Sequence, residues 1–316
     1  MSTGKAFKYK LVIITIFVLI ALLVFFLPTS AKRQKDTKGG IGEKQIRRRG
    51  ENFSQKRLTC RYFDEARFKR SLQSGSDVDT SKIGHKERIK GGIVPHHLLA
   101  DKMIADFFKV ASESNPEVII VIGPNHKSEG TKMIYTAGWD WNTPFGVLEA
   151  DREITTRLAQ TKTIGQDFGL MEREHSISCL VPYIKYFMPD AKIVPILMTA
   201  TDKKDSAVEL AKLFCEVIRG KKCLFIASVD FSHYLSLEKA DEKDEISKQA
   251  LLKRDINQIR GMGNDYMDSK ISIIALLLAM NELGADEQLI LEHNNSARIS
   301  GEALHSTTSY FTVVYW

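Results

Sequence analysis

The segment "PEVIIVIGPNH", Pro116–His126, decides the fold class of this 316-residue chain. Five branched aliphatic residues follow one another from Val118 to Ile122, and the run then ends in Gly-Pro-Asn-His. A continuous apolar run bounded by turn residues is typical of a strand that is buried on both faces of a parallel sheet. The segment therefore predicts a central parallel strand whose carboxyl end carries His126.

Helix-like and strand-like segments alternate on both sides of this run. Apolar residues recur at helical spacing in residues 98–114, 151–162, 175–188, 206–220, 244–261 and 268–284. Further apolar runs of strand type occupy residues 90–96, 191–199, 222–233 and 309–316. This alternation predicts an α/β fold for residues 88–316, as a single domain with a largely parallel mixed sheet flanked by helices.

A long apolar segment lies near the amino terminus. Residues Leu11–Leu27, "LVIITIFVLIALLVFFL", are apolar except for Thr15 and carry no charge. This length is at the short end of what crosses a bilayer. We therefore expect residues 1–31 to form either a transmembrane helix or a signal peptide that is cleaved near Pro28–Ala31. A buried core helix is disfavoured because the segment has no polar face.

The membrane side of such an anchor stays open. The flank at residues 31–50 is more basic than the residues before the apolar segment, which favours a cytoplasmic domain by the positive-inside tendency. Short N-terminal anchors of this form nevertheless often export the chain that follows. We expect a single-pass membrane anchor, with cleavage and export as the alternative.

The basic excess of the chain is confined to its first third. Residues 1–90 carry 21 Lys and Arg against 8 Asp and Glu, whereas residues 91–316 carry 24 against 31. The domain is therefore mildly acidic, and we expect no nucleic-acid partner. Residues 32–87 are interpreted as a basic flexible linker, which is either solvated or lies along anionic lipid headgroups.

Several common function classes lack their sequence signature. The four cysteines form no C-x-x-C pair, which disfavours a structural zinc site. No P-loop and no G-x-S-x-G motif occurs, which argues against an NTPase and an α/β-hydrolase.

Three predicted strands end in side chains that can carry chemistry. "IVPHH" brings His96, "VIIVIGPNH" brings His126, and "CLFIASVDFSH" brings Asp230 and His233. Ligands of open α/β sheets bind at the carboxyl ends of strands. His96 and His126 are one βαβ unit apart, so we expect them on neighbouring strands. A single histidine there is more often structural, but three at one edge favour a metal or acid/base site.

A third metal ligand is then needed. Two imidazoles and one carboxylate suit non-haem Fe(II) and also zinc. Asp268 lies just before a long apolar helix and is either this ligand or the N-cap of the helix. Glu174 and His175 stand at another loop-to-helix boundary, where a helix cap and a surface histidine are the simpler interpretation. His97 should point away from His96, since adjacent side chains of an extended segment alternate.

Six blocks of the sequence resemble, in order, those of the MEMO family, whose bacterial members are called AmmeMemoRadiSam system protein B. They span about residues 90–316 and read "VPHH", "VIGPNHKS", "TPFGVLEAD", "REHSISCLVPYI", "ASVDFSHY" and "TSYFTVVYW". The resemblance implies a relation to the catalytic subunits of class III extradiol ring-cleaving dioxygenases, with a mixed α/β fold and a metal pocket.

The resemblance also implies roles for individual residues. His96 and His126 match the first two metal ligands of the family, and Asp268 falls where the third ligand stands, a Cys in animal members. Fe(II) is then the expected cofactor, with copper or zinc as alternatives. Further pocket residues with catalytic roles are implied at three positions, of which the last is the acid/base candidate: His175, Asp230 and His233.

One block departs from the family pattern. The family usually has Pro-His-Ala-Gly followed by an aromatic residue, whereas this chain has "PHHLLA". His97 thus replaces a small residue beside the first ligand and puts the shape of the pocket in question.

We expect a metal-dependent redox protein that takes a small-molecule or peptide ligand in the metal pocket. The alternatives are a non-catalytic metal- or peptide-binding scaffold and, third, a zinc-dependent hydrolase.

Overall fold

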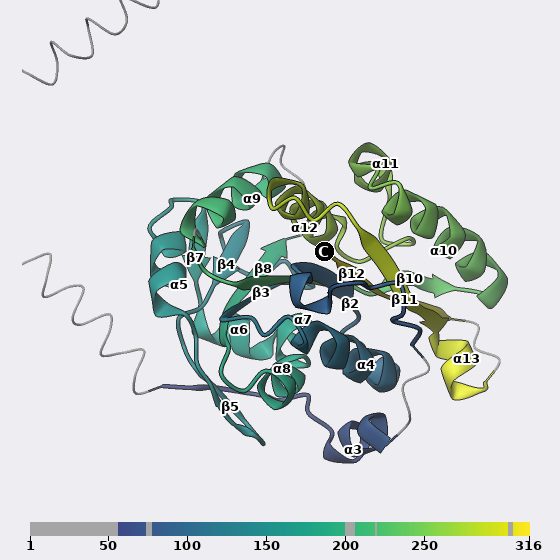
Figure 1. Ribbon diagram of the computed structural model, residues 1–316, viewed down its shortest axis with the longest axis horizontal. Helices are drawn as coiled ribbons and strands as arrows, with labels where there is room; N and C mark the ends of the chain where they lie inside the picture. Colours follow the sequence, from purple (N-terminus) through teal and green to yellow (C-terminus); the bar gives the residue numbers. More distant parts are fainter. Residues whose placement is uncertain (1–55, 74–77, 200–205, 219, 303–305) are drawn as a thin grey trace, which may run out of the picture. The chain divides into compact units, whose positions relative to one another are not determined.

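A computed structural model describes residues 56–73, 78–199, 206–218, 220–302 and 306–316 (Figure 1). The expected transmembrane helix or signal peptide at residues 1–31 and the first part of the expected linker lie outside the described residues. Within the described ranges, no helix has the length and apolar character needed to cross a membrane.

A nine-stranded sheet forms the centre of the domain. Its strands follow the order β10-β12-β2-β9-β3-β8-β4-β7, and β11 pairs with β12 outside this order. The bounds are β2 Gly91–Val94, β3 Val118–Asn125, β4 Ile134–Thr136, β7 Ile164–Gln166, β8 Lys192–Thr199, β9 Cys223–Ser228, β10 Phe231–Leu235, β11 Gln288–Asn295 and β12 Thr307–Tyr315.

The sheet is mixed, as expected, and its parallel pairs are the central ones and the edge pair β4–β7. Strand β3 pairs in parallel with β8 and β9, and β9 pairs in parallel with β2. By contrast, β12 is antiparallel to β2, β10 and β11, and β4 is antiparallel to β8. "Largely parallel" is therefore too strong. The C-terminal strands β11 and β12 are separated by one short helix, and so short a connection suits antiparallel neighbours.

Helices cover both faces of the sheet (Figure 1). Their bounds are α4 Asp101–Ser112, α5 Arg152–Ala159, α6 Phe168–Arg173, α7 His175–Ser178, α8 Val181–Phe187, α9 Ser206–Val217, α10 Leu237–Leu252, α11 Ile256–Gly261, α12 Lys270–Glu282 and α13 Ser296–Ser300. The described residues also form two short 3₁₀ helices, η1 Lys86–Arg88 and η2 Leu98–Ala100.

The central strand β3 packs on two separate apolar layers. Ile120 and Ile122 lie in one layer with residues of α9 and α12, whereas Ile119 and Val121 lie in the other with residues of α4 and α8. All four side chains are fully buried. The aliphatic run is continuous because each face of this strand has a helical layer to contact.

Part of the expected linker is folded onto the domain. Strand β1, Leu58–Thr59, joins β5, Trp141–Thr143, and β6, Gly146–Leu148, in a three-stranded sheet. Helix α3, Glu65–Gln73, buries Phe68 in the layer that contains residues of α4. The boundary expected at residue 88 is therefore too late, because Leu58 and Phe68 are buried apolar anchors within a basic segment.

Candidate metal centre

His96 lies two residues after the end of β2 and is almost completely buried, with 1% of its surface exposed. Its Nδ1 lies 3.0 Å from Ser228 Oγ at the end of β9, and that hydroxyl donates to the carbonyl oxygen of Ser176. Since the hydroxyl hydrogen is used, the Ser228 oxygen accepts a hydrogen bond from Nδ1–H of His96. The Nε2 atom of His96 is then left with its lone pair.

His126 follows β3 and is held by one carboxylate. Glu174 Oε1 lies 2.8 Å from Nδ1 of His126, and Glu174 Oε2 accepts from the backbone N–H of His126 at 3.0 Å. Burial alone would raise the pKa of Glu174, but hydrogen bonds from His126 and His175 keep it well below its usual range. An ionised Glu174 accepts from Nδ1–H, so Nε2 is the atom of His126 that a metal ion would bind.

Asp268 meets both histidines from the segment before α12. Its Oδ2 lies 3.2 Å from His96 Nε2 and 3.6 Å from His126 Nε2. The N-cap of α12 is Ser269, whose side chain accepts from the backbone N–H of Ser272, so Asp268 is not the cap. Both carboxylate oxygens of Asp268 are buried and have no hydrogen-bond donor within the described part of the chain.

The electrostatics of the cluster suit a cation. Burial alone would raise the pKa of Asp268, but His96 and His126 hold it below its usual range. Burial alone would lower the pKa of His126, yet the adjacent carboxylates of Asp268 and Glu174 raise it to about 10. Without a metal the ring therefore holds a proton at Nε2, and a bound cation would replace that proton. The site thus gathers carboxylates around a position where positive charge is stabilised.

Two overlapping sets of donor atoms describe one centre. The ligand atoms of His96, His126 and His175 lie within 4.8 Å of one another, and so do those of His96, Asp230 and Asp268. His96 belongs to both sets and has only Nε2 free, because Nδ1 contacts Ser228. The sets therefore share one nitrogen, which fits a single metal ion better than two.

The strands that precede His96 and His126, which we expected to be neighbours in the sheet, are not adjacent. Strand β9 lies between β2 and β3, so the strands that carry His96 and His126 are separated by one strand. The imidazole rings still meet, with centroids 5.1 Å apart, because both histidines lie beyond the carboxyl ends of their strands. The inserted strand supplies Ser228 and leads to Asp230, which contact His96.

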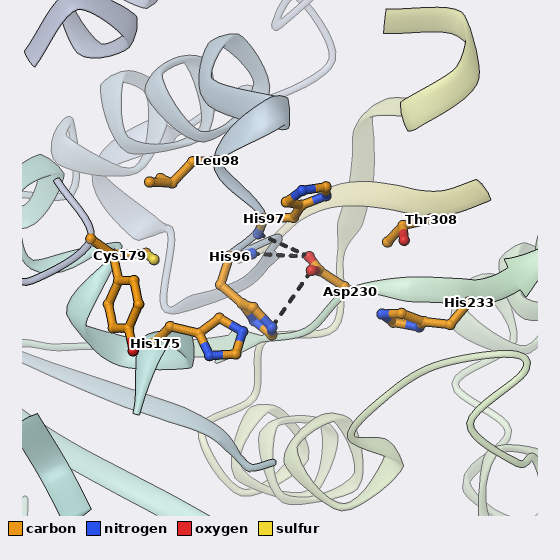
Figure 2. Close-up of a pocket in the computed structure, with 9 residues that line it drawn as sticks. His96, His97, Leu98, His175, Cys179, Asp230, His233 and Thr308 are labelled. Atoms are coloured by element: carbon orange, nitrogen blue, oxygen red, sulfur yellow. Dashed lines mark hydrogen bonds and ion pairs between the residues drawn. The ribbon is translucent and has the colours of Figure 1, made fainter. Parts of the chain in front are cut away.

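A cavity of about 460 Å³ opens at this centre (Figure 2). His175, Asp230 and His233, all expected in the pocket, line it together with His96. Asp230 accepts from the backbone N–H of His96 at 3.0 Å, which fixes the turn after β2. Nδ1 of His233 is buried, with no hydrogen-bond partner among the described residues.

His97 turns away from His96. Its Nδ1 hydrogen-bonds the hydroxyl of Tyr310, and its ring also lines the cavity. Burial lowers the pKa of His97. The bulky residue at this position is therefore accommodated by a partner on β12, and its side chain lies among those that line the cavity (Figure 2).

The sequence does not indicate that Glu174 and Ser228 hold the two metal-binding histidines. Glu174 was interpreted as a helix cap, and it does accept from the backbone N–H of Ser176, but it also holds His126. Ser228 ends an apolar strand and carries no spacing signal. Of the other histidines, His85 pairs with Glu87 and His293 with Asp244, outside the cluster, and His305 lies outside the described residues.

The residues present fit a metal ion. Two imidazole Nε2 atoms face a buried carboxylate that has no hydrogen-bond donor in the described ranges. Such a carboxylate is costly unless a positive charge compensates it. Two nitrogens and one carboxylate are a donor set that suits non-haem Fe(II) and zinc.

Comparison with known proteins places the chain in a family. A sequence model described as Memo-like protein matches residues 63–314. The chain is 33% identical over 226 residues to a MEMO1 family protein of Methanococcoides burtonii, covering 69% of this chain and 84% of that protein. It is 30% identical over 237 residues to a MEMO1 family protein of Pyrobaculum aerophilum, covering 72% and 83%.

A solved structure of an uncharacterized protein from Escherichia coli covers 71% of this chain and 99% of its own, at 12% identity and a TM-score of 0.48. That likeness is too low to support an argument, and the family assignment rests on the sequence matches. With a match to 63–314 and relatives at 30% identity or more over two thirds of its length, the chain belongs to the Memo-like protein family.

Proposed function

We propose that this MEMO family member binds a divalent metal ion through His96, His126 and Asp268 and acts as a metal-dependent redox protein. Fe(II) is the metal we propose first, with copper and zinc as alternatives. The observation that carries the proposal is the buried Asp268 carboxylate, which faces two imidazole Nε2 atoms at 3.2 and 3.6 Å.

The remaining residues of the cavity have roles in this proposal. Iron held by two imidazoles and one carboxylate, with positions left open, supports O₂-dependent chemistry when it is bound. His233 would hold or deliver a proton at Nδ1, which is buried at the cavity and has no hydrogen-bond partner among the described residues. Asp230 positions His96 through its backbone N–H.

His175 lies beside the centre rather than at its middle. Its ring stacks on His126 with centroids 4.2 Å apart, and its Nδ1 lies 3.2 Å from Glu174 Oε1. We propose that His175 orients His126 and acts on the ligand with its second nitrogen.

The cavity volume favours a small molecule over a peptide as the ligand. Small-molecule sites commonly measure about 300–1,000 Å³, and the cavity at the centre is about 460 Å³. The expected N-terminal anchor would place this site near a membrane, and that location remains part of the proposal.

Metal analysis tests the proposal directly. The full chain is purified without oxygen, and bound metals are measured by mass spectrometry in the wild type, in His126→Ala and in His85→Ala. His85 is the matched control, because its exposed ring pairs with Glu87 outside the cluster. We expect near-stoichiometric iron in the wild type and in His85→Ala, and loss of iron in His126→Ala.

Each other outcome has a defined meaning. A wild-type protein without bound transition metal would overturn the metal site. Bound zinc in place of iron would favour the hydrolase alternative. Bound iron without O₂ consumption in the presence of catechol-like compounds would favour the non-catalytic scaffold.

A further inference from the structure

A second cavity lies against the first. It has a volume of about 280 Å³ and is lined by charged residues that include Arg61, Lys127, Glu129 and Arg173. We call it the charged chamber, and we call the cavity lined by His96, Asp230 and His233 the histidine chamber. Among the described residues, only Tyr62 and His175 line both chambers.

The two chambers reach different ligands of the proposed metal centre. His96 lines the histidine chamber, whereas His126 lines the charged chamber. Tyr62 and His175, which line both chambers, therefore lie between them. The rings of these two residues have centroids 5.8 Å apart.

Tyr62 is held in place by its own hydrogen bond and by contacts of the residues that precede it. Its hydroxyl donates to the carbonyl oxygen of Arg173 at 2.8 Å, which ties the ring to the end of α6. The preceding residue Arg61 contacts Glu172 Oε2 at 2.7 Å, and Thr59 donates to Glu172 Oε1 at 3.0 Å. Leu58, which is fully buried, anchors the segment in the sheet with β5.

The position of Tyr62 in the chain is informative. The family match begins at residue 63, so Tyr62 and β1 precede the matched region. The segment that carries Tyr62 therefore comes from the part of the chain expected to be a linker. Because Tyr62 is not a ligand of the centre, a change at this position can alter what the centre accepts without changing the centre itself.

We propose that Tyr62 is a specificity-determining residue that separates the histidine chamber from the charged chamber and restricts ligands of the centre to small molecules that fit the histidine chamber. Removal of the ring joins the chambers and admits longer ligands. The identity of the ligand rests on the proposed function, but the separation of the chambers does not.

Cys179 reports on the separation without any metal. It lines the histidine chamber and is 4% exposed. The rate of its modification is measured with a small methanethiosulfonate, the methyl reagent, and with a bulky one that carries a benzophenone. Peptide mapping of the full chain by mass spectrometry follows Cys179 separately from the other cysteines.

We expect Tyr62→Ala to raise the rate at which the bulky reagent modifies Cys179 about tenfold, which corresponds to an activation free energy lowered by about 1.4 kcal/mol. The rate of modification by the methyl reagent should change much less. Tyr62→Phe keeps the ring and should stay near the wild type. Tyr186→Ala is the matched control. Tyr186 has 45% of its surface exposed, close to the 41% of Tyr62, and it lines neither chamber. Tyr62→Trp should slow the bulky reagent further.

The proposal is overturned if the ratio of the two rates in Tyr62→Ala equals that of the wild type, or if Tyr186→Ala changes it equally. If Tyr62→Ala does not fold, Tyr62→Trp decides: a bulky-reagent rate that does not fall also overturns the proposal. The outcome is independent of metal analysis, so failure of the separation and failure of the metal site are distinguishable.

Discussion

Glu174 is the residue whose replacement tests the organisation of the site most sharply. Its Oε1 accepts from His126 Nδ1 at 2.8 Å and from the backbone N–H of Ser176 at 3.0 Å, and its Oε2 accepts from the backbone N–H of His126 at 3.0 Å. Glutamine has nearly the same shape but only one acceptor oxygen. In either orientation of the amide, its NH₂ group faces at least one N–H donor.

The expected loss of stability follows from the number of hydrogen bonds that glutamine cannot make. The better orientation keeps the bonds of Oε1 and leaves the backbone N–H of His126 without an acceptor. An unsatisfied buried donor costs about 1–3 kcal/mol. We therefore expect Glu174→Gln to lower the free energy of unfolding of the metal-free protein by that amount. Replacing a residue that orients a metal-binding histidine weakens metal affinity by about 10–100-fold, and we expect the same for Fe(II).

Urea unfolding of the metal-free protein and anaerobic Fe(II) competition titrations measure the two effects. Glu129→Gln is the matched control, because Glu129 forms an exposed ion pair with Arg173. Exposed pairs contribute about 0–1 kcal/mol, so this variant should stay near the wild type. If Glu174→Gln were as stable as Glu129→Gln and bound Fe(II) equally well, the role given to Glu174 would be wrong.

Three further predictions address the support of His96, the packing of the sheet and a buried thiol. Ser228→Ala removes the acceptor for Nδ1–H of His96 and should weaken Fe(II) binding by about 10–100-fold in the same titration; equal affinity would contradict the assigned tautomer. Gly92→Ala would place a Cβ 2.5 Å from a backbone oxygen of β12, so we expect a loss of about 3 kcal/mol in urea unfolding, whereas Gly84→Ala, with no atom within 4 Å, should change little. Burial raises the pKa of Cys60 from 9.0 to about 12, so the free energy of unfolding should fall as the pH rises through that interval, where only the unfolded thiol ionises. Cys60→Ser should reduce this slope, and an unchanged slope would speak against a buried thiol.

The sequence predicted the elements of the domain well because their causes are local. The aliphatic run at Val118–Ile122 predicts a strand with two buried faces, and β3 has both faces in apolar layers. The pairing of the C-terminal strands is harder to predict from the sequence. Besides β11, strand β12 pairs with β2 and β10, which lie far from it in the sequence. No local pattern indicates which edge of a sheet a returning strand will join.

The sequence by itself determined that His96, His126 and Asp230 stand where strands end, since apolar runs and turn residues fix that locally. Only the tertiary structure decided that β9 lies between the two histidine strands, that Asp268 faces them while Ser269 caps the helix, and that Tyr62 reaches the site. These facts depend on chain crossovers and on contacts between residues far apart in sequence. Such contacts are selected by the packing of the whole domain, which no single segment encodes.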